Sequence, residues 1–255
     1  MSFDFTLEKY RELMAAMVGS GYRVLTVGEY LTEKNTSPPF IVLRHDVDRR
    51  PENALKMARA EHEFSVTSTY YFRKTPNAFR PAIVEGVSQL GHEIGYHYET
   101  LVKSKGDVDK AAALFEKELE AFRAICHVET ICMHGSPLSK WDNRDLWNTY
   151  DFRNYGIKGE AYLSVDFEAI VYLSDTGRTW HSQKFNIRDR RAGLAPPDIE
   201  RTDELIRILG SKGLEKVYLL VHPNRWADGK FELYSSALSD VFLNYAKVFI
   251  HRVRN

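Results

Sequence analysis

The sequence predicts an α/β protein built on a parallel sheet or a β/α barrel. Short runs rich in β-branched and aromatic residues alternate with longer segments whose apolar residues recur at helical spacing. This alternation is typical of parallel strands joined by crossover helices. The 255 residues, 44% hydrophobic and 27% charged, are enough for one large domain with a sizeable core. We therefore expect a single domain over residues 1–255.

Each predicted element follows from a local pattern. Gly19 and Gly21 end a first amphipathic helix, and Gly91 ends a later one. Residues 138–166 are aromatic without a sustained period, so we expect a long loop or a small accessory subdomain. Helices are expected at about 7–18, 51–62, 81–90, 108–126, 202–213 and 234–252. Strands are expected at about 22–27, from Phe40 onward, and at 66–72, 92–98, 129–133, 169–173 and 217–221.

Polar side chains stand where five of these strands end. In a β/α barrel the carboxyl ends of all strands meet on one face, where such enzymes place their chemistry. His, Asp and Glu are the types that a metal site or an acid–base pair requires. Asp46 and Asp48 have a second interpretation, because Asp also caps a helix that starts with proline. The five groups are His45/Asp46/Asp48, His97/Glu99, His134, Asp175/Arg178 and His222.

Composition excludes several classes of protein. The formal net charge is zero and basic clusters are absent, so no nucleic-acid partner is expected. Cys126 and Cys132 are too few for a disulfide framework and are interpreted as buried thiols. No run is long enough for a membrane span, and the N-terminus has charges where a secretory peptide needs apolar residues. We expect a cytoplasmic protein.

Short motifs follow the predicted strands. They are Arg44-His-Asp-Val-Asp48, Gly91-His-Glu-Ile-Gly-Tyr-His97, Met133-His-Gly-Ser-Pro137, Asp175-Thr-Gly-Arg178 and Leu220-Val-His222-Pro-Asn-Arg-Trp226. Through these motifs the chain resembles the polysaccharide deacetylases of the NodB-homology (carbohydrate esterase) type, over roughly positions 38 to 230. More narrowly, it looks like a branch of deacetylases of bacterial surface-polysaccharide (O-antigen) synthesis.

The resemblance implies a distorted β/α barrel of about seven parallel strands and a metal-dependent deacetylase acting on an N-acetylated sugar. Asp46 would be the catalytic base and Asp48 a metal ligand. His222 would be the general acid, with Asp175 and Arg178 orienting the catalytic groups. A divalent metal, with zinc favoured, would be the cofactor.

The chain departs from the family pattern at the metal. His97 matches a family metal ligand, but the position four residues later is Leu101, where the family has a second histidine. We predict that His134 supplies this imidazole from the neighbouring strand end, giving Asp48, His97 and His134 as ligands. Glu99 is the alternative third ligand.

Two rival functions remain open. Asp46-Val-Asp48 is also an Asp-x-Asp, which a glycosyltransferase uses to hold a metal–nucleotide diphosphate, and Leu101 is compatible with a relative that only binds sugar. Trp141 and Trp226 would either stack on the sugar or pack in the core. A cytoplasmic location predicts that the substrate is a nucleotide- or lipid-linked sugar. The sequence makes no prediction for the oligomeric state.

Overall fold

An all-parallel sheet organises the molecule. The computed structural model describes residues 3–33, 36–136, 139–180, 194–229 and 232–233, so the predicted helix 234–252 lies outside the described residues. Its strands are β1 (Arg23–Leu25), β2 (Phe40–Val47), β3 (Thr69–Arg73), β4 (Glu93–Tyr98), β5 (Thr130–Met133), β6 (Gly159–Glu160), β7 (Val171–Ser174) and β8 (Lys216–Val221).

The strand order is that of a barrel with one break. The sheet runs β6-β5-β4-β3-β2-β8-β7, and β1 pairs with the first half of β2. Seven strands therefore follow one another in chain order from β2 round to β8, which pairs again with β2. Among the described residues no ladder joins β6 to β7, so the ring is open there. The predicted α/β class and distorted barrel of about seven parallel strands are confirmed.

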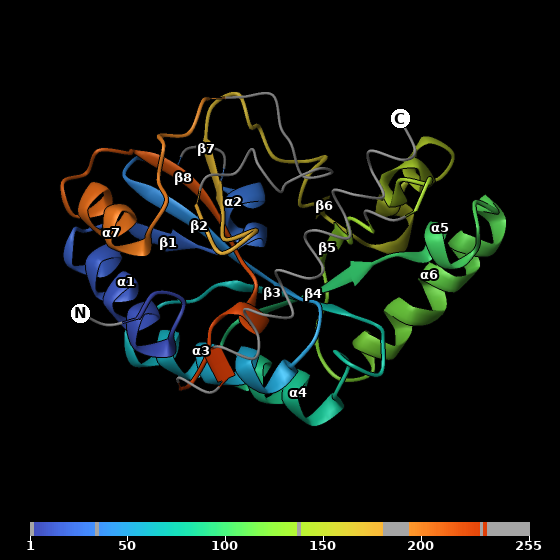
Figure 1. Cartoon of the computed structure of the whole chain (residues 1–255). Coiled ribbons are helices and arrows are strands. Elements are labelled where there is room, and N and C mark those ends of the chain that lie inside the picture. Colours follow the sequence, from blue (N-terminus) through green and yellow to red (C-terminus); the bar gives the residue numbers. More distant parts are fainter. Residues whose placement is uncertain (1–2, 34–35, 137–138, 181–193, 230–231, 234–255) are drawn as a thin grey trace.

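Helices pack around the outside of the curved sheet (Figure 1). The predicted helices that fall within the described residues are present, and short α2 and α5 are additional. Thr6 caps α1 by accepting a hydrogen bond from the Lys9 backbone, and Pro51 begins α3. The helices are α1 (Leu7–Gly19), α2 (Val27–Thr32), α3 (Pro51–Glu63), α4 (Pro81–Gln89), α5 (Thr100–Lys103), α6 (Val108–Arg123) and α7 (Thr202–Gly210), with 3-10 helices η1 (Asn143–Asn148), η2 (Phe152–Tyr155) and η3 (Pro223–Arg225).

The start of α3 decides between the two interpretations of the Asp pair. Its N-cap residue is Arg50, and no side chain caps the helix there. Asp46 lies inside β2, and Asp48 follows the strand. The helix-capping interpretation is therefore wrong, and both carboxylates are left for another role.

The alternation of β2 separates its polar residues. Ile41 and Leu43 pack in the hydrophobic cluster that includes α1 and α7, whereas Val42 belongs to the other cluster. Because successive side chains point to opposite faces, His45 and Asp46 must also diverge. His45 lies within 2.7 Å of Glu61 Oε1 on α3. It is therefore separated from the two carboxylates that follow it.

Residues 138–166 extend the core. Their described part contains η1, η2 and β6, and Trp147 makes an edge contact with Phe115 of α6 at a centroid distance of 4.9 Å. The Trp147 indole also donates a hydrogen bond to the Tyr98 hydroxyl, at 2.8 Å.

Among the described helices, none is long and apolar enough to cross a bilayer.

Candidate metal and acid–base site

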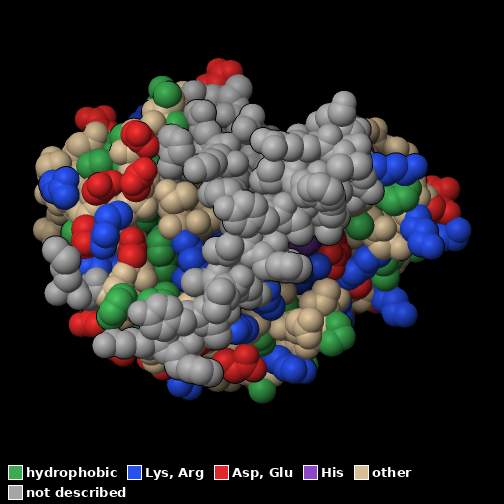
Figure 2. Space-filling view, viewed as in Figure 1, with side chains coloured by type: hydrophobic (Ala, Val, Ile, Leu, Met, Phe, Trp, Pro, Cys, Tyr) green, Lys and Arg blue, Asp and Glu red, His purple; other side chains and the backbone are tan. Residues whose placement is uncertain are grey.

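Three predicted metal ligands meet at the carboxyl ends of β2, β4 and β5. Asp48 Oδ1 lies 3.3 Å from His134 Nε2 and 3.7 Å from His97 Nε2. The rings of His97 and His134 are perpendicular, with centroids 5.3 Å apart. Figure 2 shows a small histidine surface near the centre of this face, with acidic and basic side chains around it.

The second nitrogen of each imidazole fixes which atom faces Asp48. His97 Nδ1 lies 3.0 Å from the Cys132 carbonyl, which only accepts hydrogen bonds, so Nδ1 carries the hydrogen. His134 Nδ1 lies 2.9 Å from the Ser136 hydroxyl and 3.3 Å from Glu99 Oε2. In the neutral rings both Nε2 atoms therefore present lone pairs toward the Asp48 carboxylate.

This arrangement fits a cation. Asp48 Oδ1 is buried and has no hydrogen-bond partner, although two acceptor nitrogens face it. Burial alone would raise the pKa of Asp48, but the charges of His134, His97, His222 and Arg73 lower it overall. Two imidazole nitrogens and one carboxylate are also the donor set of many catalytic zinc sites.

Glu99, the alternative third ligand, lies on the far side of His134. Its Oε2 is near His134 Nδ1 and accepts a hydrogen bond from Arg73 at 2.6 Å. Burial raises the pKa of Glu99, but His134 and Arg73 outweigh it and bring it to about 2. Glu99 is therefore an anion that contacts Nδ1 of His134, whereas Asp48 faces Nε2 on the other side of the same ring.

A second cluster of possible metal ligands lies deeper in the barrel. Ligand atoms of Asp46, His97 and Cys132 all lie within 4.8 Å of one another, and all three side chains are buried. Cys132 is the register partner of His97 on β5, so the two side chains share a face. Sequence analysis treated Cys132 as an ordinary buried thiol. Its position two residues before His134 on one strand is the signal that places it on the site face.

His222 is held by a buried carboxylate. Its Nδ1 lies 2.6 Å from Asp175 Oδ1, and its backbone N–H donates to Asp175 Oδ2 at 2.9 Å. Arg225 and the Trp226 indole donate to the same carboxylate, at 2.6 and 3.0 Å. Burial raises the pKa of Asp175, but Arg225 and His222 lower it further than burial raises it. Arg225 Nη1 also lies 2.7 Å from His222 Nδ1, so Nδ1 is occupied by Asp175 and Arg225, and Nε2 is the nitrogen left for a reactant.

The cations that contact Asp46 and Asp175 were not predicted. Arg225 contacts Asp175, and Arg44 Nη2 donates to Asp46 Oδ2 at 3.1 Å. Arg178 follows a tight turn at φ 57°, and its guanidinium carbon lies 5.9 Å from the Phe5 ring centroid. The orienting role of Arg178 therefore stays a prediction.

The two tryptophans differ in their surroundings. Trp226 is buried, and its ring lies 5.1 Å from Tyr10 and 5.2 Å from Phe5 between centroids. It packs in the core, so it offers no face to a sugar. Trp141 is partly buried at the edge of the core, with Lys140 Nζ 4.8 Å from its ring centroid.

A cavity of about 530 Å³ lies at the opposite end of the strands. It is lined by residues such as Gly28, Glu93 and Glu129, none of which belongs to the predicted site. Glu93 is already bonded to the Gly28 backbone and the Thr69 hydroxyl. Converging charge, and not cavity volume, therefore identifies the candidate site.

Comparisons with known proteins give distant structural likenesses. A mutant CE4 family pseudoenzyme superposes with a TM-score of 0.43 and 12% identity, covering 82% of this chain and 63% of its own. A family 4 carbohydrate esterase from Bacillus anthracis gives 0.39 and 13%, covering 91% and 84%. No known family and no curated protein matches the sequence. At these scores the likenesses carry no argument about activity, which must rest on the site itself.

Proposed function

We propose that this chain is a metal-dependent hydrolase that removes the acetyl group from an N-acetylated sugar in bacterial surface-polysaccharide (O-antigen) synthesis. The observation that carries the proposal is the convergence of two imidazole Nε2 atoms on the unpartnered Asp48 Oδ1. Asp46 and the Asp175–His222 pair add a base and an acid to the same face. The resemblance of the motifs to deacetylases supplies the substrate class.

Asp48, His97 and His134 would hold the divalent metal, with zinc favoured by the two nitrogen donors. When bound, such an ion polarises the amide carbonyl and a water molecule, and it stabilises negative charge on the carbonyl oxygen. Glu99 stands behind His134 and the Cys132 carbonyl behind His97, so both rings are held in the tautomer that binds a cation.

The protein's own groups handle the protons. The oxygen of the attacking water bonds to the acyl carbon, and Asp46 accepts the proton that the water loses. The carbon–nitrogen bond then breaks, and His222 donates the proton from Nε2 to the departing amine. Asp175 accepts the Nδ1–H of His222 and compensates the imidazolium charge. The products are acetic acid, which ionises to acetate, and the free amino sugar. Asp46 then loses its proton to solvent and His222 takes one up from solvent, which restores the starting state.

The two rival functions, glycosyl transfer and sugar binding without catalysis, would require different groups in the site. A glycosyltransferase would have no use for an Asp-oriented histidine beside its Asp-x-Asp, whereas Asp175 holds His222 through both oxygens. A protein that only binds sugar has no need for carboxylate and imidazole atoms facing each other inside a barrel. The hydrolase gives a role to both carboxylates of the Asp-x-Asp, to the two imidazoles that face Asp48, and to the Asp175–His222 pair.

The first experiment combines metal analysis with acetate release from acetamido sugars. Wild-type protein should carry about one divalent ion per chain. His134→Ala should weaken metal binding about ten- to a hundredfold or more, and Asp46→Asn should keep the ion but lose about a hundredfold in rate. The matched control is His127→Ala, because His127 is exposed and pairs with Glu129, which lies outside the site.

Each outcome has a consequence. Full activity in Asp46→Asn would remove Asp46 from the chemistry, and stoichiometric metal in His134→Ala would remove His134 from the ligand set. A metal-free wild type that binds sugar without releasing acetate would favour the non-catalytic rival. Release of an intact nucleotide diphosphate would favour the glycosyltransferase.

A further inference from the structure

A fully buried arginine lies directly beneath the proposed base. Arg44 is 0% exposed and precedes Asp46 by two residues on β2, so both side chains point to the same face. Its Nη2 donates to Asp46 Oδ2 at 3.1 Å and to the Tyr162 hydroxyl at 2.5 Å. One guanidinium nitrogen thus joins the carboxylate to a residue of the 138–166 segment.

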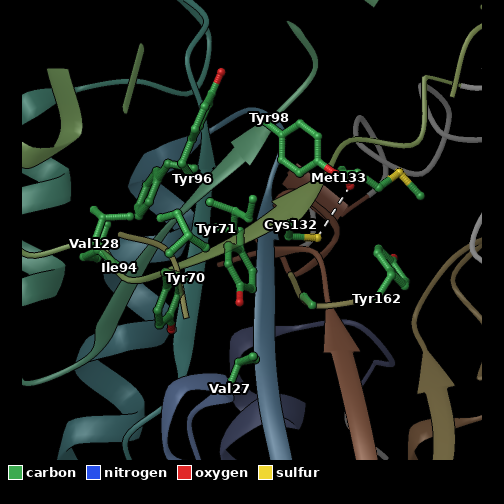
Figure 3. Close-up of a cluster of buried hydrophobic side chains, with 14 of the residues drawn as sticks. Val27, Tyr70, Tyr71, Ile94, Tyr96, Tyr98, Val128, Cys132, Met133 and Tyr162 are labelled. Carbon is green, nitrogen blue, oxygen red and sulfur yellow. Dashed lines mark hydrogen bonds between the residues drawn. The ribbon is translucent and has the colours of Figure 1, made fainter. Parts of the chain in front are cut away.

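Aromatic rings enclose this cation. The guanidinium carbon lies 4.3 Å from the centroid of Tyr162, 5.5 Å from Tyr218 and 5.9 Å from Tyr71. Figure 3 shows Tyr71 and Tyr162 reaching this interior from β3 and from the segment after β6. Burying a guanidinium is costly unless an anion and well-placed acceptors compensate it. Within this enclosure the guanidinium forms an ion pair with Asp46.

We propose that Arg44 is a positioning residue that fixes the orientation of the Asp46 carboxylate, and that Tyr162 fixes Arg44. The inference rests on the proposed function, in which Asp46 is the base. Asp46 is only 3% exposed, so its rotation is limited by what binds it, and the Arg44 bond holds Oδ2. A carboxylate held in this way keeps its free lone pairs aimed at the site.

The proposal gives the 138–166 segment a role in catalysis. Tyr162 is itself held in place, because its backbone N–H donates to Glu160 Oε2 at 2.7 Å. Glu160 also accepts a hydrogen bond from the Met133 backbone at 2.8 Å, which ties the segment to β5. The chain of contacts runs from β5 through Glu160, Tyr162 and Arg44 to Asp46.

The test measures kcat, KM and metal content in three variants. Tyr162→Phe removes the hydroxyl but keeps the ring, and should lower kcat about tenfold with KM and metal unchanged. Arg44→Met removes the cation and should lower kcat about a hundredfold, the effect expected when a reacting group is misplaced by about 1 Å. Arg44→Lys keeps a charge without the planar fork and should fall between these two.

The matched control is Tyr22→Phe. Tyr22 is also buried and also loses a hydroxyl hydrogen bond, to the Leu214 carbonyl, but it lies outside the site. Its kcat should equal that of wild type even if its stability falls. If Arg44→Met does not fold, Tyr162→Phe and Arg44→Lys carry the test.

Two failures are distinguishable. Unchanged kcat in Tyr162→Phe and Arg44→Lys, with an active wild type, would overturn the positioning role alone. A wild type that releases no acetate would overturn the proposed function, and the positioning of a hydrolytic base would fall with it. A rise in KM with constant kcat would show that Arg44 supports substrate binding, which also contradicts the proposal.

Discussion

At the scale of single residues, the proposed metal site takes its second histidine from a different strand end than the family pattern does. Leu101 stands where the family pattern places a second histidine, and its side chain is buried in the hydrophobic cluster. His134, on the neighbouring strand end, brings its Nε2 to 3.3 Å from Asp48 instead. The proposed exchange rests on the pairing of β4 with β5, whose neighbouring ends bring His97 and His134 to the same point.

Glu99 provides a test of how His134 is held. Glu99→Gln keeps the size of the side chain but removes the negative charge beside His134 Nδ1, and should lower metal affinity about tenfold, clearly less than His134→Ala does. A competition assay with a chromophoric chelator would measure this. Glu120→Gln, which removes an exposed carboxylate from α6, is the control.

Two results for Glu99→Gln would contradict this role: a complete loss of metal, or an unchanged metal affinity. Loss of metal as complete as in His134→Ala would mean that Glu99 is itself a ligand. Unchanged affinity would mean that Ser136 alone orients the ring, since its hydroxyl lies 2.9 Å from His134 Nδ1.

At the scale of elements, β2 carries two separate polar systems on its two faces. Asp46 faces the site, whereas His45 contacts Glu61 on α3 at 2.7 Å. The Tyr10 hydroxyl of α1 and the Ser68 hydroxyl also donate to the Glu61 carboxylate. This fully buried network ties α1 and α3 to the strand that carries the proposed base.

The Glu61 network predicts a defined acid sensitivity. Burial raises the pKa of Glu61, but His45, His92 and the Ser68 hydroxyl bring it from 4.5 to about 2. A depressed acid pKa contributes stability above the unfolded value, and this is lost as pH falls toward the folded value. The drop corresponds to about 3 kcal/mol. Urea unfolding of the wild type should therefore show falling stability between about pH 4.5 and 2.

Glu61→Gln should flatten this part of the pH profile and be less stable at neutral pH. Glu120→Gln, which removes an exposed carboxylate from α6, is the control and should follow the wild-type profile. Burial also lowers the pKa of His92. As the pH falls below about 6.5, this histidine should therefore cause a separate loss of stability. A Glu61→Gln profile that still falls between pH 4.5 and 2 by the wild-type amount would contradict the assignment.

The elements also show how far sequence could go. Among the described residues, the long helices and seven of the eight strands lie within a few residues of their predicted positions. The short α2, α5 and β6 contain six, four and two residues, too few for a period to appear. Tertiary pairing alone places β6 against β5.

The same limit applies to the site. Asp48, His97 and His134 could be predicted because each follows an apolar strand. Arg44 and Cys132 looked like parts of strands, and their roles depend on which strands are neighbours. Arg225 lies three residues beyond His222, and only the turn of η3 brings it to Asp175.

At the scale of the whole molecule, the ring of strands gathers charge at one end. Arg73 lies 4.0 Å from Asp48, Lys103 lies 3.4 Å from Glu99, and Arg225 stands beside His222. These side chains are partly exposed and border the proposed metal ligands. Each of these cations already pairs with a carboxylate, so a phosphate attached to the sugar would bind them in competition with Glu99, Glu118 and Asp175, whereas a neutral polymer has no charge to offer them.

The last prediction concerns the substrate. We propose that the acetamido sugar is nucleotide- or lipid-linked, so acetate release should be fastest with nucleotide-linked acetamido sugars. Chitin oligomers and peptidoglycan should be poor substrates, and the unlinked N-acetylated monosaccharide is the matched control. Because the attraction is between exposed charges, added salt should raise KM for the linked sugar and leave the monosaccharide unaffected. Activity confined to long polymers would reject the linked substrate while leaving the hydrolytic chemistry of Asp46 and His222 in place.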